Sequence, residues 1–238
     1  GPGIKAENIN KSYGSLQVLK NLNLEIIEGE TLVILGRSGV GKSVLLKLLM
    51  GLEQPDSGDV FIQEKSILNV KEKDLFKITR SMGMLFQSGA LFDSMNVEEN
   101  VGFYLQHNPE PSTNKRLTEE EIQDRVEEAL KMVGLSGTNK KIPSQLSGGM
   151  RKRAALARLI AYRPSIYLYD EPTTGLDPIT AQQINELILM IQQKFGATSI
   201  VVTHDIPSAL YVANRLALHE EGHLPIISPI NEFIKNAN

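Results

Sequence analysis

The chain has 238 residues, of which 22% are charged, and its formal net charge is −3. This balance gives no overall electrostatic reason to expect nucleic acid as a partner, and the absence of cysteine excludes disulfides and thiolate metal sites. No apolar stretch reaches the roughly 18 residues of a membrane-spanning helix, so we expect a chain that does not enter the bilayer, folded as one α/β domain with or without an inserted lobe.

The N-terminal part predicts antiparallel strands at one edge of the fold. Apolar and polar residues alternate over Ile4–Asn10 and again over Leu22–Ile27. Tyr13 lies in the polar connection between them, just before Gly14. Its ring is suited to stacking on a base such as adenine, and an ordinary turn tyrosine is equally compatible with the local sequence.

A glycine-rich turn, Gly36–Ser43, lies between the apolar run Thr31–Leu35 and the apolar run Val44–Met50. Its residues are Gly36, Arg37, Ser38, Gly39, Val40, Gly41, Lys42 and Ser43. The order strand, glycine-rich turn, helix is that of a phosphate-binding loop. Backbone N–H groups converge on phosphate oxygens, Lys42 reaches the β- and γ-phosphates, and the Ser43 hydroxyl ligates Mg²⁺. A plain glycine turn is the alternative, which the complete eight-position match makes the weaker interpretation.

The middle of the chain changes in character. The strand Ser81–Phe86 leads to Gln87, a neutral donor and acceptor that is suited to contact Mg²⁺ or a water. Residues 96–159 are then predicted to form a helical subdomain inserted between the two parts of an α/β core, 4–95 and 160–238. Within it, a helix beginning after Thr118 is expected to bury an apolar stripe, which consists of Ile122, Val126, Ala129, Leu130 and Val133.

A second turn with anion-binding character opens the helix Met150–Tyr162. Ser147, Gly148 and Gly149 offer backbone N–H groups and a hydroxyl at a helix N-terminus. One nucleotide does not need two such sites on one chain. We therefore expect a dimer in which this turn closes over ATP held by the phosphate loop of the other chain.

Two later strands end in polar side chains that are suited to phosphate chemistry. Ser165–Tyr169 is followed by Asp170, which is placed to hold Mg²⁺, and by Glu171, which is placed to activate a water. His204 follows the strand Ser199–Thr203 and would contact the γ-phosphate or that water. In isolation the acids would suit a helix cap and the histidine a structural role. Because strands alternate with helices, we predict a mainly parallel sheet covered on both faces.

Over nearly its whole length the chain resembles the nucleotide-binding domain of an ABC transporter. The motifs that carry the resemblance are, in chain order, Tyr13, Gly36–Ser43, Gln87, Leu146–Met150, Asp170 with Glu171, Gly175–Asp177 and His204. The resemblance implies a P-loop NTPase core in which these are the A-loop aromatic, Walker A, Q-loop, signature, Walker B with catalytic glutamate, D-loop and switch histidine. It also implies a head-to-tail homodimer that binds two ATP molecules with Mg²⁺ and cleaves them to ADP and phosphate.

Two positions depart from the usual family pattern. Met150 replaces a glutamine, and Gly175 replaces an alanine before Leu176 and Asp177. Neither change removes a phosphate ligand, so we expect activity to be retained.

Two segments, Leu146–Arg158 and Gln87–Val97, resemble the Mla-type phospholipid-transport ATPases. That subgroup implies a membrane permease, a lipid-binding subunit of the mammalian-cell-entry type, no nucleic acid, and a peripheral position on the cytoplasmic face of the inner membrane. The alternatives are an ABC ATPase of another importer or exporter, and a soluble ABC ATPase without a transport role. A phosphoryl-transfer enzyme that uses the phosphate loop alone would leave Ser147–Gly149 unexplained.

Overall fold

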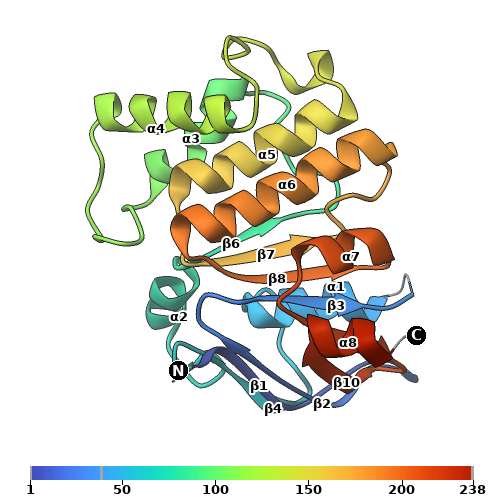
Figure 1. Cartoon of the computed structure of the whole chain (residues 1–238). Helices are drawn as coiled ribbons and strands as arrows, with labels where there is room; N and C mark the ends of the chain where they lie inside the picture. Colours follow the sequence, from blue (N-terminus) through green and yellow to red (C-terminus); the bar gives the residue numbers. More distant parts are fainter. Residues whose placement is uncertain (1, 38–39, 237–238) are drawn as a thin grey trace.

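The computed structural model describes residues 2–37 and 40–236, which form two β-sheets and the helices around them (Figure 1). The larger sheet has six strands in the order β10-β9-β3-β8-β7-β6, and the smaller has four in the order β2-β1-β4-β5. The strands of the larger sheet are β3 (Thr31–Leu35), β6 (Met82–Leu85), β7 (Ile166–Asp170), β8 (Thr198–Thr203), β9 (Arg215–Glu220) and β10 (His223–Pro229). Those of the smaller sheet are β1 (Pro2–Tyr13), β2 (Leu16–Ile27), β4 (Ser57–Ile62) and β5 (Lys65–Ser66).

The helices differ widely in length. They are α1 (Val40–Leu49), α2 (Glu72–Thr79), α3 (Val97–His107), α4 (Glu119–Met132), α5 (Gly148–Tyr162), α6 (Pro178–Phe195), α7 (Ile206–Val212) and α8 (Ile230–Asn236), with a 3-10 turn at Pro143–Gln145. None of the helices in the described part of the chain is both long and apolar enough to cross a membrane.

The larger sheet is mainly parallel, as predicted. Strand β3 runs parallel to β8 and β9, and β7 runs parallel to β6 and β8, while β10 pairs with β9 in the antiparallel direction. Every residue of β3, β7 and β8 is buried, which accounts for their nearly continuous apolar sequences. The antiparallel strands predicted at the N-terminus belong to the separate smaller sheet.

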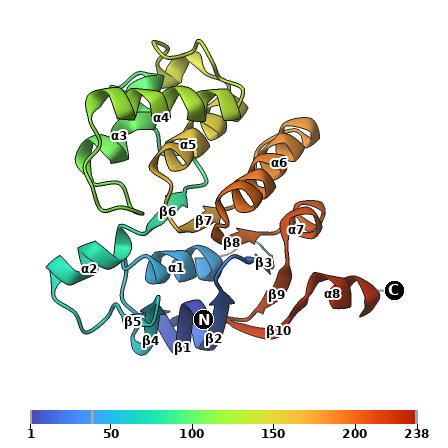
Figure 2. The same ribbon diagram turned by 60° about the vertical axis from the view of Figure 1, so that its left-hand side comes forward.

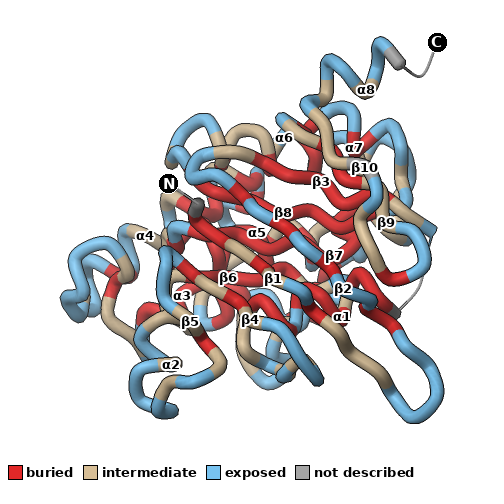
Figure 3. The backbone as a smooth tube through the Cα atoms, turned by 90° about the horizontal axis from the view of Figure 1, so that it is seen from below, coloured by how far each residue is buried: buried red, intermediate tan, exposed pale blue. Residues whose placement is uncertain are grey.

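Alternate residues of the parallel strands point into two different cores. In β3, Leu32 and Ile34 belong to the core that also contains α1 and the smaller sheet, whereas Val33 and Leu35 belong to the core that contains residues of α3 to α7. Figures 1 and 2 show this division, with α3, α4, α5 and α6 on one side of the parallel sheet and α1 with the smaller sheet on the other. Seen from below, the buried strands lie inside a margin of exposed turns (Figure 3).

Helices α3 and α4 both contact α5. Each begins with a reciprocal capping box, formed by Asn96 with Glu99 and by Thr118 with Glu121. The predicted apolar stripe is buried against this core: Ile122, Val126, Ala129, Leu130 and Val133 are all at most 5% exposed. The boundaries of a subdomain at 96–159 stay a prediction, and α5 itself continues to Tyr162.

A buried carboxylate organises the loop between α3 and α4. Glu110 is 3% exposed and accepts hydrogen bonds from the Ser112 hydroxyl and from the backbone N–H and hydroxyl of Thr113, while Arg125 lies 3.5 Å away. Burial alone would raise the pKa of Glu110, but these hydrogen bonds and the guanidinium outweigh it and lower the pKa to about 2. The loop therefore depends on Glu110 being charged.

The structure contains some elements that the sequence did not predict, and it gives others different boundaries. Strand β1 extends to Tyr13 and β2 starts at Leu16, so the turn shrinks to Gly14 and Ser15, with Gly14 at a φ of 61°. Helices α2 and α7 were not predicted, and neither were β10 and α8 near the C-terminal end of the described chain. Short helices carry too few periodic positions to be recognised from the pattern of apolar residues alone.

Candidate functional site

The polar residues predicted at the strand ends meet at one edge of the larger sheet. Leu35 of β3 pairs with Thr203 of β8, so Gly36 and His204 both follow the same pair of residues. The Gly36 N–H donates to the Thr203 carbonyl at 3.2 Å. Asp170 pairs with Val202 of β8, which places Asp170 and Glu171 beside them. This is the carboxyl edge of a parallel sheet, where α/β folds bind ligands.

Lys42 lies in the first turn of α1 and is 2% exposed. Its ammonium donates to the carbonyl oxygens of Gly36 and Thr203, the second at 3.1 Å, and lies 3.4 Å from Glu171 Oε1. Burial lowers the pKa of Lys42, while the nearby carboxylates of Glu171 and Asp170 act in the opposite direction. A positive charge is thus fixed at the N-terminus of a helix, where anions are attracted.

Two oxygen atoms beside Lys42 suit a hard divalent cation. The Ser43 hydroxyl lies 3.2 Å from Asp170 Oδ1. Burial raises the pKa of Asp170, and the hydrogen bond from Ser43 opposes that shift. The described residues contain no group of three or more His, Cys, Asp or Glu side chains arranged so that they could hold a metal ion by themselves. Mg²⁺ does not need such a cluster, because it is usually bound through one or two protein oxygens and the phosphates of a substrate.

Glu171 connects several elements of the site. Its backbone has a φ of 47°, a left-handed conformation that is unfavourable for a residue with a side chain. Its Oε2 atom lies 2.9 Å from His204 Nδ1 and accepts a hydrogen bond from Thr174 Oγ1 at 3.1 Å. The side chain of Glu171 is 10% exposed and that of His204 is 45% exposed. The carboxylate is therefore oriented by its neighbours and lies next to an imidazole that faces solvent.

His219 of β9 packs closely against Gly36 and Gly41 of the phosphate loop. A Cβ atom added at Gly41 would lie 2.9 Å from His219 Nε2 and 3.1 Å from the Val18 carbonyl oxygen, and one added at Gly36 would lie 3.0 Å from the His219 carbonyl oxygen. These distances explain why both positions are glycine. Burial lowers the pKa of His219, and Lys42 adds to this effect.

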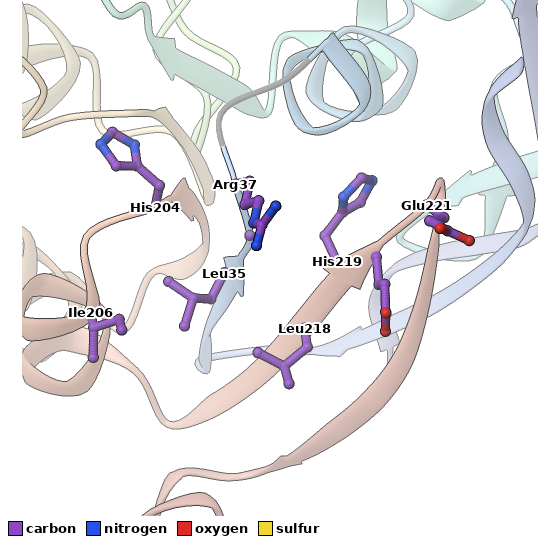
Figure 4. Close-up of a pocket in the computed structure, with 9 residues that line it drawn as sticks. Leu35, Arg37, His204, Ile206, Leu218, His219 and Glu221 are labelled. Carbon is purple, nitrogen blue, oxygen red and sulfur yellow. The ribbon is translucent and has the colours of Figure 1, made fainter. Parts of the chain in front are cut away.

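A cavity of about 890 Å³ opens beside this loop. Figure 4 shows His204 on one side of this region and His219 on the other, with Arg37 and Leu35 between them. Its lining includes residues at the carboxyl ends of β3 and β8, so the cavity lies directly beside the phosphate loop.

Tyr13 and Gln87 have no described contact with Lys42 or Ser43. The Tyr13 hydroxyl donates to Glu53, the Lys11 ammonium lies 5.3 Å from the Tyr13 ring centroid, and the tyrosine is 42% exposed. Gln87 is exposed and follows β6, whose Leu85 pairs with Tyr169 of β7. Gln87 and Glu171 therefore continue from the same pair of residues on neighbouring strands. The roles predicted for Tyr13 and Gln87 stay predictions.

The second predicted anion-binding turn is a separate feature. We call Ser147–Gly149 the signature turn. Ser147 caps α5 by accepting a hydrogen bond from the Met150 N–H at 3.2 Å, and Ser147 and Gly148 are exposed. Within the described residues, no hydrogen bond or ion pair joins the signature turn to Lys42 or Ser43. One chain therefore does not bring its two predicted phosphate-binding turns into contact.

Asp177 lies beside the signature turn. It caps α6 by accepting hydrogen bonds from the Thr180 N–H at 3.1 Å and the Thr180 hydroxyl at 2.6 Å, and these bonds lower the pKa of Asp177. A Cβ atom added at Gly149 would lie 2.6 Å from Thr180 Cγ2. Thr180 thus packs between Gly149 and Asp177.

Two predicted site residues lie outside the described part of the chain, and the structure adds two residues that were not predicted. Ser38 and Gly39 lie outside the described residues, and Val40 begins α1. Sequence reasoning did not single out His219 or Lys152, and Lys152 lies between Arg151 and Arg153, where one more basic residue does not stand out. Lys152 is 5% exposed, and its ammonium lies 3.3 Å from the Glu171 carbonyl oxygen.

Residues 19–174 match the family described as ABC transporter. Among similar proteins, the "Probable ribonucleotide transport ATP-binding protein mkl" of Mycobacterium leprae is 42% identical over 96% of this chain and 64% of its own length. The "Sulfate/thiosulfate import ATP-binding protein CysA" of Mannheimia succiniciproducens is 38% identical over 97% of this chain and 62% of its own length. This chain thus spans less than two thirds of the length of these two relatives.

Two solved structures have similar folds. The ATP-binding cassette MJ0796, described as the dimeric structure of a post-hydrolysis state bound to ADP and Pi, has a TM-score of 0.85 and 34% identity, and the match covers 95% of this chain and 98% of that chain. The cbiO1 protein of Clostridium perfringens, described as part of the ABC transporter complex cbiONQ, has a TM-score of 0.85 and 32% identity, covering 99% of this chain and 92% of that one.

Proposed function

Because this chain belongs to the ABC transporter family, we propose that it is the ATP-binding subunit of a transporter and hydrolyses ATP to ADP and phosphate. The observation that carries the proposal is the convergence, at one sheet edge, of Lys42 and Ser43 of α1 with Asp170 and Glu171 at the end of β7. A buried lysine at a helix N-terminus, next to a hydroxyl and two carboxylates, is the set of groups that phosphoryl transfer requires.

The residues around the phosphate loop divide into three tasks. Backbone N–H groups of Gly36–Ser43 and the Lys42 ammonium bind the phosphates, and Tyr13 stacks on the adenine. Ser43 and Asp170 hold Mg²⁺, with Gln87 as a further ligand. When bound, Mg²⁺ neutralises negative charge on the phosphate oxygens.

Glu171 is the general base in this proposal. A water attacks the γ-phosphorus, its proton passes to the Glu171 carboxylate, and the bond from the γ-phosphorus to the bridging oxygen breaks, so that ADP leaves with that oxygen. His204 orients the carboxylate through the contact at 2.9 Å and lies on the exposed side, where it can contact the γ-phosphate.

The second phosphate-binding turn belongs to a homodimer in this proposal. The signature turn of one chain closes over the ATP held by the phosphate loop of the other, with Asp177 at the same interface. The exposure of Ser147 and Gly148 supports this arrangement, as does the dimeric form of the similar MJ0796 cassette. ATP binding would then close the dimer, and hydrolysis would reopen it.

A membrane permease is the partner that receives this movement. A mostly apolar cavity of about 230 Å³ lies between α2 and β6, and Phe86, which precedes Gln87, lines it. Its lining also includes Leu52, which is 58% exposed, and Phe76, which is 55% exposed. Exposed apolar side chains around a cavity suit the docking of a helix. We place the permease there. The cytoplasmic face of the membrane is the side that the resemblance to ABC transporter ATPases implies for this chain.

The transported substrate is the finest part of the proposal. Resemblance of Leu146–Arg158 and Gln87–Val97 to the Mla-type ATPases favours phospholipid, with a lipid-binding subunit of the mammalian-cell-entry type in the complex. The relatives named above are described as acting on ribonucleotides and on sulfate or thiosulfate, which keeps another importer as the alternative.

Two experiments test ATP hydrolysis and the transport assignment separately. Phosphate release from ATP by the purified chain tests hydrolysis, and Lys42→Ala should abolish ATP binding measured by calorimetry. Unchanged ATP affinity in that variant would contradict the role of the loop. Purification of the native membrane complex, followed by identification of bound subunits and lipids, tests the transport assignment. A complex without phospholipid, loaded instead with a small solute, would overturn the lipid assignment alone.

A further inference from the structure

Lys152 is a buried charged residue to which the proposed mechanism assigns no role. It lies in the first half of α5 and is 5% exposed, and its ammonium donates to the main-chain carbonyl of Glu171 at 3.3 Å. In the described part of the chain, this carbonyl is the only hydrogen-bond partner of the ammonium. Burying an ammonium group is costly unless it is paired, so its position needs a reason.

Two opposing effects act on the charge of Lys152. Burial lowers the pKa of Lys152 to about 8, and the negative charges of Asp170 and Glu171 act against that shift. The negative charges of the two acids at the end of β7 thus favour the charged form of Lys152, while its hydrogen bond is made to the Glu171 backbone and not to a carboxylate.

The peptide that Lys152 contacts is under conformational strain. Glu171 has a φ of 47°, and its N–H donates to the Val202 carbonyl at 2.9 Å. On the other side, the Glu171 carbonyl accepts hydrogen bonds from Lys152 and from the Thr174 N–H, which lies 3.2 Å away. A strained backbone persists only when surrounding contacts fix it, and the direction of the Glu171 side chain depends on it. Loss of one contact would let the carboxylate move away from the attacking water.

We propose that Lys152 is a positioning residue for hydrolysis: it holds the main chain of Glu171 in the conformation that directs the carboxylate toward the attacking water. The inference rests on the proposed role of Glu171 as the base. Because Ser147 caps α5, the same contact connects the proposed base to the helix that follows the signature turn. Lys152 itself contacts neither Lys42 nor Ser43, so it should affect the chemical step and not ATP binding.

The test is Lys152→Met, which keeps the length of the side chain and removes its donor. We expect kcat to fall at least about tenfold, while the dissociation constant for ATP stays within about twofold of the wild-type value. Lys152→Arg keeps a donor of similar reach and should recover most of the lost kcat. Lys131→Met, at an exposed position in the last turn of α4, is the matched control and should leave both values unchanged.

Each outcome decides the inference. A Lys152→Met enzyme with kcat within twofold of wild type overturns it, as does an arginine variant no more active than the methionine one. Loss of ATP affinity in proportion to kcat would indicate a general structural role and also overturn it. If the methionine variant does not fold, Lys152→Gln replaces it, since its shorter side chain removes the contact but stays polar. A wild-type chain without ATPase activity would instead refute the proposed function.

Discussion

Glu171→Gln is the substitution that separates the proposed general base from the rest of the site. The amide keeps the shape of the side chain and an oxygen that accepts the hydrogen bond from Thr174 Oγ1, but it loses the charge and cannot take a proton from water. General-base catalysis contributes 10²- to 10⁴-fold to a rate, which corresponds to about 3 to 5 kcal/mol of activation free energy. We therefore expect turnover to fall at least 100-fold.

The same substitution should do little harm to ATP binding. It removes the carboxylate 3.4 Å from the Lys42 ammonium, but Lys42 keeps its hydrogen bonds to the carbonyls of Gly36 and Thr203. We expect a loss of about 1 to 2 kcal/mol in the free energy of unfolding without nucleotide, which bound phosphate would offset.

Single-turnover phosphate release and ATP binding, measured on the same preparation, check both expectations. Glu120→Gln, at an exposed position of α4, is the control and should match wild type. In light scattering, ATP should hold the Glu171→Gln chain as a stable dimer. Turnover within tenfold of wild type would refute the assignment of Glu171 as the base.

Other predictions concern the signature turn, the back of the phosphate loop and the loop between α3 and α4. Ser147→Arg should block ATP-driven dimerisation but leave ATP binding by the monomer intact; normal dimers in light scattering would contradict the composite site. Gly41→Ala should weaken ATP binding about tenfold because its Cβ would lie 2.9 Å from His219 Nε2. Adding His219→Ala to the same chain should restore part of the ATP affinity. A double variant that binds ATP no better than Gly41→Ala would show that this contact is not the cause. Glu110→Gln should lower the free energy of unfolding by about 2 to 3 kcal/mol at pH 7. The folded-state pKa of Glu110, about 2, lies below its usual value of 4.5, so this stabilisation is present above pH 4.5 and is lost as the pH falls toward 2. Denaturant unfolding at pH 7 and pH 3 measures it, and an equal difference between variant and wild type at both pH values would contradict the reasoning.

Much of the fold could be predicted because its signals are local. The strand before Gly36, the glycine-rich turn and the helix after it occupy neighbouring positions, and the stripe from Ile122 to Val133 repeats at helical spacing. The carboxyl edge of a parallel sheet then brings Asp170 and His204 toward Lys42 by topology alone.

What escaped prediction depends on contacts between distant segments. The Glu171 carbonyl meets Lys152 of α5, and Gly41 meets His219 of β9, and neither pairing leaves a pattern in the nearby sequence. The role of Glu110 was missed for a similar reason, since an acid among prolines and hydroxyl residues resembles an ordinary solvated loop. Such contacts become visible only when the chain is folded.

Mixing two inactive variants tests the shared ATP site most directly. Lys42→Ala removes the phosphate lysine, and Ser147→Arg blocks the signature turn, so each variant alone should hydrolyse almost no ATP. In a mixed dimer, the intact phosphate loop of one chain faces the intact signature turn of the other, which restores one of the two sites. An equal mixture should therefore regain at least about a quarter of the wild-type rate. Random pairing would make half of the dimers mixed, with one intact site in each, and the block on pairing between two Ser147→Arg chains raises that share. A mixture as inactive as its two components would contradict the composite site.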